Sequence, residues 1–423
     1  MQVIETFGKY IENLSSTDSE KCQKLLKLGW QAQNIKFKMF SDKNLTPADR
    51  YLSRLMMNTM LAPLKHPDNS VIVSIFTPCE ILHEAGMLPY NVEAFSSFLS
   101  GSMAEQEFLH YAESEGVAET LCSYHKVFIG AADKGILPKP KLIVYTNIVC
   151  DGNLLTFKRL SQKYDVPSFF IDVPLKQNDE SVLYVAEQLR ELSSFIEKHT
   201  EKEIDTDKLS IRLHRTKRTL EGYAAYQKLR ADKYVPSDLV SPMYAAMTNN
   251  ILLGTENEEK YIKMLLENIN SAPTSKGKRI YWMHTIPFWS SAIKEHLSLN
   301  EQAQIVGCEL AQVFDMDFNP DKPYEAMAKR LVYHAINGGA TERIENGIRH
   351  AKEANADGVI WFNHWGCKST LGTAQLAKKK FEQQGIPLLI LDGDGCNRSH
   401  GGEGQTSTRI GAFLEMLGGD SYK

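Results

Sequence analysis

Short apolar runs that end in small, polar or cysteine residues recur along this chain, and segments with helical patterning lie between them. This alternation is typical of α/β proteins, because parallel strands are buried on both faces and are joined by helical crossovers. It predicts strands at residues 71–76, 142–149, 168–173, 279–284, 304–310, 358–363 and 387–392. It predicts helices at residues 153–163, 180–198, 324–336, 342–354 and 371–384.

The chain of 423 residues is longer than one ordinary core accommodates, which predicts more than one domain. Residues 201–275 are long, charged and helical in pattern, without a convincing strand, and divide the chain. We therefore expect two doubly wound parallel-sheet domains, at 66–200 and 276–423, with a helical connector or cap between them and an N-terminal helical segment at 1–65. The crevice between two such units is a natural place for a functional site.

Composition and motifs exclude several classes of function. The formal net charge is only -4 and no long basic run is present, so neither nucleic acid nor an anionic membrane is an expected partner. The N-terminus lacks the pattern of a signal peptide and no apolar segment approaches the ~18 residues of a membrane span, so we expect a cytoplasmic protein. No P-loop is present, which argues against ATP hydrolysis by this chain itself.

The seven cysteines are widely spaced, odd in number and free of CxxC pairs, which argues against a disulfide framework or a zinc ribbon. Five of them lie at the carboxyl ends of predicted strands: Cys79, Cys150, Cys308, Cys367 and Cys396. Cys122 heads the helix-like stretch ETLCSYHKVFIGA. Carboxyl ends of parallel strands meet at one edge of a sheet, so these thiols could gather in space.

Two interpretations of the cysteines stay open at this point. A free cysteine usually packs as a small hydrophobe, and for any single position here packing is the favoured explanation. The set as a whole has polar neighbours (Gly, Asp, Asn, Lys and Ser), which suit a metal site better than a core. Soft thiolate ligands select iron–sulfur clusters, zinc or Cu(I).

Other polar residues lie beside these cysteines. In the stretch FNHWGCKS, His364 and Lys368 flank Cys367, and adjacency alone predicts that they line a site and supply protons or hold an anionic group. His364 and His400 have the alternative of being hydrogen-bonded structural residues. The stretch DGDGCNRSHGG begins like a calcium loop but lacks the later glutamate, so Asp392 and Asp394 are expected to position a loop by accepting backbone hydrogen bonds.

Several segments, in this order, resemble the subunits of 2-hydroxyacyl-CoA dehydratases and ATP-dependent benzoyl-CoA reductases: TPCEILHEAGMLPY, LCSYHK, VYTNIVCDGN, ADGVIWFNHWGCKS and GIPLLILDGDG. The resemblance runs from about Ser74 to near the C-terminus. It implies a low-potential 4Fe-4S cluster in the cleft between the two domains, held by cysteines that match Cys122, Cys150 and Cys367.

The resemblance also implies an activity and partners. A separate ATP-hydrolysing iron–sulfur activator protein would inject one electron, which permits radical dehydration or reduction of a CoA thioester. The chain would then be an oxygen-sensitive iron–sulfur dehydratase (a lyase) or reductase (an oxidoreductase) that forms a homodimer or a heterodimer with a related subunit. Its substrate would be an acyl-CoA or another small molecule.

Cys79, Cys308 and Cys396 are additional to the family's three cysteines. They make the chain similar also to the double-cubane cluster proteins, a homodimeric branch with two linked cubanes per chain and reductase activity on small unsaturated molecules. Without Cys22, which lies in a polar N-terminal helix, six cysteines remain, three for each cubane. Two further hypotheses are a non-catalytic electron-transfer iron–sulfur protein and a metal-free α/β protein.

Overall fold

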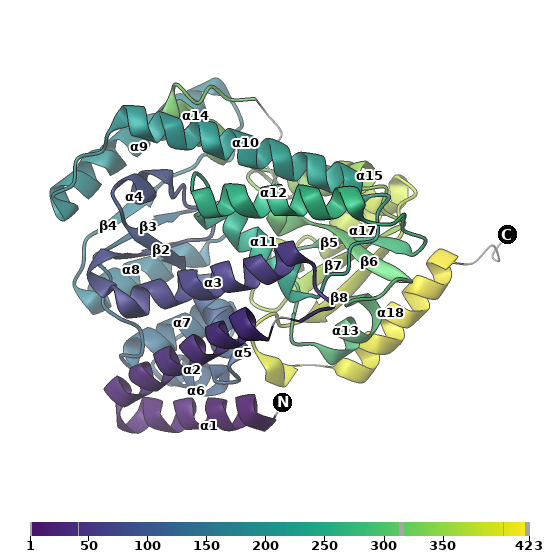
Figure 1. Ribbon diagram of the computed structural model, residues 1–423, viewed down its shortest axis with the longest axis horizontal. Helices are drawn as coiled ribbons and strands as arrows, with labels where there is room; N and C mark the ends of the chain where they lie inside the picture. Colours follow the sequence, from purple (N-terminus) through teal and green to yellow (C-terminus); the bar gives the residue numbers. More distant parts are fainter. Residues whose placement is uncertain (1, 41, 313–316, 401, 419–423) are drawn as a thin grey trace.

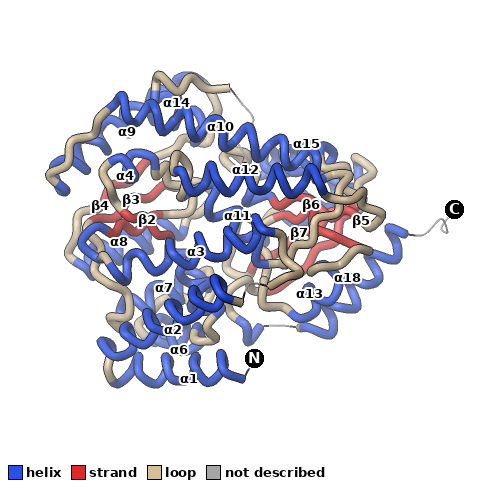
Figure 2. The backbone as a smooth tube through the Cα atoms, in the orientation of Figure 1, coloured by secondary structure: helices blue, strands red, loops and turns tan. Residues whose placement is uncertain are grey.

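The computed structural model describes residues 2–40, 42–312, 317–400 and 402–418, and contains two four-stranded sheets in which every pairing is parallel (Figures 1 and 2). The first has the order β2-β1-β3-β4, built from β1 (Ser70–Val73), β2 (Leu88–Asn91), β3 (Leu142–Thr146) and β4 (Ser168–Ile171). The second has the order β6-β5-β7-β8, built from β5 (Lys278–Met283), β6 (Ala303–Cys308), β7 (Gly358–His364) and β8 (Leu388–Gly393). Both predicted parallel sheets are confirmed.

The two sheets share one connectivity. In each, the first strand of the set is internal, the second lies on one side of it and the third on the other. After β2 the chain crosses back past β1 to form β3, and after β6 it crosses back past β5 to form β7. The point at which the strand order changes direction therefore lies between β1 and β3 in the first sheet and between β5 and β7 in the second. In open parallel sheets, ligands bind in the crevice outside the carboxyl ends of the strands at such switch points.

All seven predicted strands form, and one strand was missed. β2 was not predicted because it is only four residues long, contains Pro89 and follows the short helix α4 (Glu80–Glu84) closely. Proline is tolerated there because β2 is at the edge of its sheet, where one side needs no backbone donor. The predicted strands 71–76 and 142–149 overran β1 and β3, whose carboxyl ends lead into loops.

Both faces of the second sheet are covered by helices. Ile280 and Trp282 of β5 belong to the main core, which also holds residues of α13 (Ser291–Leu297) and α18 (Glu403–Gly418). Tyr281 and Met283 point to the opposite face, where they pack with α15 (Ala340–Glu353) and α17 (Ala374–Gln383). This alternation is the period of two expected of a strand buried on both sides.

The remaining helices include those predicted at residues 153–163, 180–198 and 324–336, together with others that were not individually predicted. In chain order they are α1 (Gln2–Thr17), α2 (Ser19–Met39), α3 (Pro47–Lys65), α5 (Val92–Gly101), α6 (Glu105–Ser114), α7 (Ser123–Asp133), α8 (Gly152–Tyr164), α9 (Asp179–Thr200), α14 (Pro323–Val332) and the short α16 (Lys368–Leu371). The predicted helix 371–384 is thus two helices, α16 and α17. Single 3-10 turns lie at Pro67–Asn69, Glu309–Ala311 and Arg398–His400.

The predicted connector is helical, with α10 (Thr206–Arg230), α11 (Val240–Ile251) and α12 (Glu256–Ser271). α10 and α12 lie side by side across the molecule (Figure 1), and α10 contacts α4 and α14 as well as β6 of the second sheet. One core cluster contains residues of both sheets and of the connector, such as Ile72, Leu209 and Trp282. None of the described helices combines the length and apolar character that crossing a bilayer requires.

The connector buries the carboxyl group of Glu258, which makes the free energy of unfolding depend on pH. Glu258 of α12 is fully buried, near Tyr51 and Tyr223, and burial raises its pKa to about 8, although the nearby Thr248 hydroxyl opposes the shift. The folded chain therefore keeps a proton that the unfolded chain loses above about pH 4.5. The contribution of the protonated Glu258 to the free energy of unfolding is therefore fully present below about pH 4.5 and is lost as the pH rises to about 8.

We expect Glu258→Gln to remove this dependence and to raise the free energy of unfolding at pH 8 by an amount on the order of 3 kcal/mol. Urea unfolding of wild type and variant at several pH values between 4.5 and 8.5 measures it. Glu267→Gln, at an exposed position of the same helix, is the matched control and should behave like wild type. If the free energy of unfolding changed with pH in the same way in wild type and in Glu258→Gln, the prediction would be contradicted.

Candidate functional site

Three cysteines lie at the amino ends of helices. Cys122 is the N-cap residue of α7, Cys150 precedes α8 by two residues, and Cys367 is the N-cap residue of α16. All three are partly exposed, whereas the other four cysteines are buried. Cys150 follows β3 and Cys367 follows β7, which are the strands at the switch points of the two sheets.

A close backbone contact joins the loop of Cys367 to that of Cys122. Gly366 has a φ of +83°, and a Cβ on it would lie 2.6 Å from the backbone nitrogen of Cys122 and 2.7 Å from its Cα. Real Cβ atoms do not approach backbone this closely, so only glycine fits. The second sheet's loop and the first unit's helix α7 are therefore in direct contact at this point.

The three thiols are electrostatic neighbours. Burial raises the pKa of Cys122 well above its usual value, and Cys150 and Cys367 raise it further. Burial also raises the pKa of Cys150 to about 12, with added contributions from Glu93 and Cys367. Each thiolate thus opposes the ionisation of the next, and a bound cation would reverse this effect because a coordinating thiol loses its proton.

A histidine contacts the sulfur of Cys122. The Nε2 of His364 lies 3.1 Å from Sγ of Cys122, and the backbone N–H of Gly395 donates to Nδ1 of His364 at 3.0 Å. Because Nδ1 accepts a hydrogen bond, the proton of the neutral ring is on Nε2 and points at the sulfur. Burial lowers the pKa of His364, so the ring is neutral at pH 7.

A second histidine contacts the sulfur of Cys150. The Nε2 of His125 lies 3.3 Å from Sγ of Cys150, and its Nδ1 is 2.9 Å from the hydroxyl oxygen of Thr156. Burial, together with the neighbouring His364, lowers the pKa of His125 to about 4. Sequence reasoning did not single out His125. Its signal was the spacing of three residues after Cys122, which places both at the start of one helix.

The loop after β8 is organised by Asp394. Its Oδ1 accepts hydrogen bonds from the hydroxyl of Ser123 at 2.6 Å and from the backbone N–H groups of Cys396 and Asn397 at 2.8 and 2.7 Å. The predicted positioning role is confirmed for Asp394. For Asp392 it is wrong, because that exposed carboxylate accepts a side-chain hydrogen bond from Asn363 instead.

The structure describes the side chain of Lys368 but not that of His400, another polar residue named near the cysteines. Lys368 is exposed beside Cys367, and its ammonium makes no hydrogen bond or ion pair with the residues that the structure describes. The side chain of His400 lies outside the described part of the structure. The catalytic roles predicted for Lys368 and His364 stay predictions.

The three additional cysteines are fully or almost fully buried, and each sulfur donates to a backbone carbonyl. The acceptors are Thr77 for Cys79 at 3.3 Å, His284 for Cys308 at 3.6 Å and Ser96 for Cys396 at 3.7 Å.

Cys396 is an electrostatic neighbour of Cys122. Cys79 neighbours Glu80 and Arg330, and Cys308 neighbours Glu309. The structure thus brings Cys396 to the margin of the three partly exposed thiols, and leaves Cys79 and Cys308 in different surroundings.

Within the described ranges, no three His, Cys, Asp or Glu side chains are arranged to hold a single metal ion. Ligands of a cluster each bind a different iron, so they surround a larger volume than the ligands of one ion do.

The sequence matches the family described as "2-hydroxyglutaryl-CoA dehydratase, D-component" over residues 74–417. The chain belongs to this family. Every cysteine except Cys22 lies within the matched region of this D-component chain. The matched region also contains every strand of the two sheets except β1 (Ser70–Val73).

Characterised relatives of this family member are distant. It is 23% identical over 367 residues to the (R)-phenyllactyl-CoA dehydratase alpha subunit of Clostridium sporogenes, covering 80% of this chain and 87% of that one. It is 22% identical over 380 residues to the lactoyl-CoA dehydratase subunit alpha of Anaerotignum propionicum, covering 80% and 88%. The (R)-2-hydroxyglutaryl-CoA dehydratase subunit alpha of Acidaminococcus fermentans is 24% identical over 305 residues, covering 68% and 62%.

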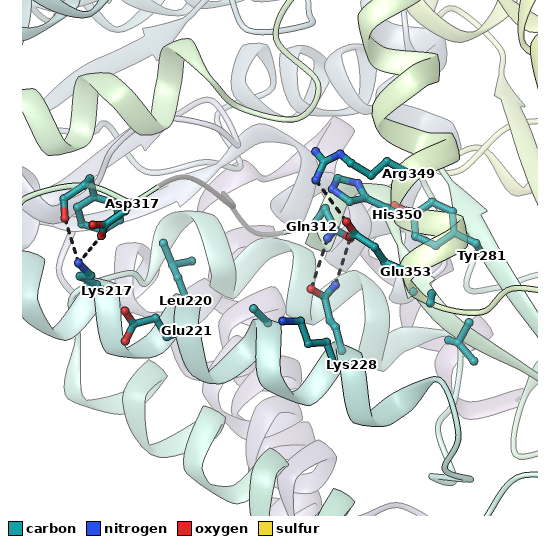
Figure 3. Close-up of a pocket in the computed structure, with 16 residues that line it drawn as sticks. Lys217, Leu220, Glu221, Lys228, Tyr281, Gln312, Asp317, Arg349, His350 and Glu353 are labelled. Carbon is teal, nitrogen blue, oxygen red and sulfur yellow. Dashed lines mark hydrogen bonds and ion pairs between the residues drawn. The ribbon is translucent and has the colours of Figure 1, made fainter.

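A separate cavity of about 640 Å³ lies between α10, β6 and α15 of this D-component chain (Figure 3). The Lys217–Asp317 ion pair is at one end, and Arg349, His350 and Glu353 are at the other. None of its described lining residues is a cysteine, so it is distinct from the cysteine site.

The contact at Gly366 can be tested by substitution. Gly366→Ala is expected to lower the free energy of unfolding by about 3 kcal/mol, since it adds a clash with Cys122 to the strain of a left-handed residue. Denaturant unfolding under reducing, oxygen-free conditions measures it. Gly385→Ala is the matched control, because Gly385 also has a positive φ (+67°) but a Cβ there would meet nothing within 4 Å. Equal losses of about 1 kcal/mol in both variants would refute the close contact.

Proposed function

We propose that this chain is a cluster-carrying subunit of a low-potential iron–sulfur enzyme of the 2-hydroxyacyl-CoA dehydratase type, and that Cys122, Cys150 and Cys367 hold a 4Fe-4S cluster. The observation that carries the proposal is the convergence of these partly exposed thiols from both halves of a chain in this family. Family membership makes an acyl-CoA reaction the leading class, and the geometry supports these residues as the ligands.

The chemistry of the donor set fits such a cluster. Thiolates are the usual ligands of iron–sulfur clusters. Cys122 and Cys367 are N-cap residues and Cys150 precedes α8 by two residues, and the amino ends of helices favour negative charge. Three protein ligands leave one iron of a four-iron cluster open, and such a cluster, when bound, supplies one-electron chemistry at low potential beside that open position. No fourth partly exposed cysteine is present among the described residues.

The residues around the sulfurs have separate tasks. His364 donates from Nε2 toward Sγ of Cys122, and His125 lies with Nε2 at Sγ of Cys150, so each sulfur has a fixed polar neighbour of zero net charge. Hydrogen bonds to ligand sulfurs orient them and change how much negative charge they carry. Asp394 holds Ser123 beside Cys122 and so fixes the amino end of α7. Lys368, exposed next to Cys367, is placed to attract an anionic group of a substrate.

The substrate class and partners follow from the same proposal. The relatives are alpha subunits of enzymes named for phenyllactyl-CoA, lactoyl-CoA and 2-hydroxyglutaryl-CoA, all 2-hydroxyacyl thioesters. We infer that this chain acts on an acyl-CoA by dehydration or reduction, together with a related second subunit. By the same family resemblance, its electron would come from a separate ATP-hydrolysing iron–sulfur activator, and the absence of a P-loop in this chain agrees with ATP hydrolysis by another protein.

One observation supports a second candidate, the double-cubane reductase. Cys396 is an electrostatic neighbour of Cys122 and is the one additional cysteine that a second cubane near the first could recruit. Against it, Cys79 and Cys308 are buried and each donates to a backbone carbonyl, whereas the three proposed ligands are partly exposed. The single cluster is therefore the better-supported proposal.

Iron and acid-labile sulfide, measured on protein purified without oxygen, test the proposal. We expect about four of each per chain. Cys122→Ser, Cys150→Ser and Cys367→Ser should each lower the iron content severalfold. Cys22→Ser is the control, because that buried thiol lies in α2 and donates to the carbonyl of Ile11 at 3.3 Å.

Other outcomes separate the alternatives. About eight irons per chain, with a loss in Cys79→Ser and Cys308→Ser, would favour the double-cubane candidate. A chain without iron would overturn every iron–sulfur proposal. A cluster whose electron paramagnetic resonance spectrum does not change when an acyl-CoA is added would favour simple electron transfer over catalysis.

A further inference from the structure

Arg343 of α15 is a buried cation that reaches the loop of Cys367. Its side chain is only 4% exposed, and its guanidinium carbon lies 5.6 Å from the centroid of the Trp361 ring. Its Nη1 donates to the carbonyl of Ser369 at 3.3 Å and also to the Ser369 hydroxyl. Ser369 follows Cys367 by two residues, and Arg343 is also a direct electrostatic neighbour of Cys367.

Glu309 holds the other side of the guanidinium. The Nε and Nη2 of Arg343 donate to Oε1 and Oε2 of Glu309 at 2.7 and 2.6 Å, a two-point contact that fixes the plane of the group. Burial alone would raise the pKa of Glu309, but the charge of Arg343 holds it below its usual value. The pair is therefore ionised at neutral pH.

Glu309 is itself anchored. It directly follows β6, and its Oε2 also accepts the backbone N–H of His284 at 3.0 Å. His284 follows β5 with a φ of +79°, an uncommon conformation for a residue with a side chain. The network thus ties together the carboxyl ends of β5, β6 and β7.

The pair forms a fixed dipole at the cysteine site. Arg343 is adjacent to the Cys367 loop, whereas Glu309 contacts Arg343 from the side of β5 and β6. Both side chains are almost fully buried, at 4% and 3% exposure, so solvent and salt screen their charges little. The positive end of the pair faces Cys367.

We propose that Arg343, oriented by Glu309, is an electrostatic positioning residue for Cys367 and raises the reduction potential of the metal centre that Cys367 holds. The inference rests on the proposed iron–sulfur function. Taking up one electron adds negative charge to the centre without making or breaking a protein bond, and a nearby buried cation stabilises the added charge. Glu309 limits this effect because it compensates part of the cationic charge from the far side.

The experiment is an oxygen-free titration with titanium(III) citrate as the one-electron reductant, in which electron paramagnetic resonance gives the midpoint potential. Arg343→Gln is expected to shift the midpoint potential to a more negative value. Glu309→Gln leaves the arginine uncompensated and is expected to shift the midpoint potential in the opposite direction. Arg343→Lys keeps the charge but loses the two-point contact, and its midpoint potential should lie between those of wild type and Arg343→Gln.

Both glutamine variants loosen the packing around the ion pair, so an effect of packing alone would not shift their midpoint potentials in opposite directions. Shifts of opposite sign therefore indicate an electrostatic role. Arg279→Gln is the control, because Arg279 pairs with Asp357 at the amino ends of β5 and β7, and its midpoint potential should match wild type. Equal midpoint potentials in iron-loaded wild type, Arg343→Gln and Glu309→Gln would overturn the inference but leave the proposed function intact.

Two further outcomes complete the test. Wild-type protein without iron would overturn the proposed function itself. If Arg343→Gln does not fold, the sign of the shift in Glu309→Gln decides: a positive shift supports the inference, and a zero or negative shift overturns it.

Discussion

The approach of Gly366 to the backbone of Cys122 is the contact on which the arrangement of the site depends. It joins a loop of the second sheet to a helix of the first unit, and no residue with a Cβ fits there. Without it, Cys367 would lie at the edge of its own sheet, and Cys122 and Cys150 would form a pair of thiols on the other side. The repeated strand order matters for the same reason, because it brings a switch-point loop from each sheet to the same place.

The electrostatics around this contact are unusual for a packing site. Burial and neighbouring thiols and carboxyl groups raise the pKa of Cys122 and of Cys150. Neutral histidines, helix amino ends and a buried arginine also surround the three sulfurs. Such surroundings favour negative charge once something cationic binds. Cys22, by contrast, lies in the hydrophobic core and donates to the carbonyl of Ile11.

Much of this architecture could be predicted from the sequence, because parallel strands buried on both faces form apolar runs that are easy to recognise. β2 escaped because a four-residue edge strand with Pro89 has no such run. Cys122, Cys150 and Cys367 came from a family resemblance, and the structure adds that they are the partly exposed ones. Asp392 was misjudged because sequence position does not tell which carboxylate of DGDG points back at the loop.

The residues that surround the thiols were the hardest to predict. Arg343 lies in ATERIENGIRHAKE, which has the pattern of an ordinary solvated helix, and its partner Glu309 is thirty-four residues away. Pairings of this kind depend on how two loops and a helix meet in space. No local pattern in the chain records that meeting, so only the folded structure reveals it.

The division of the three thiols between the two halves has a consequence for biosynthesis. Two of them are made early, and the third belongs to a strand and loop that leave the ribosome only when most of the chain has been synthesised. A nascent chain that has folded its first half therefore holds only two of the three thiols. Under the proposed function, a metal centre that needs all three is assembled only after the second sheet has been translated.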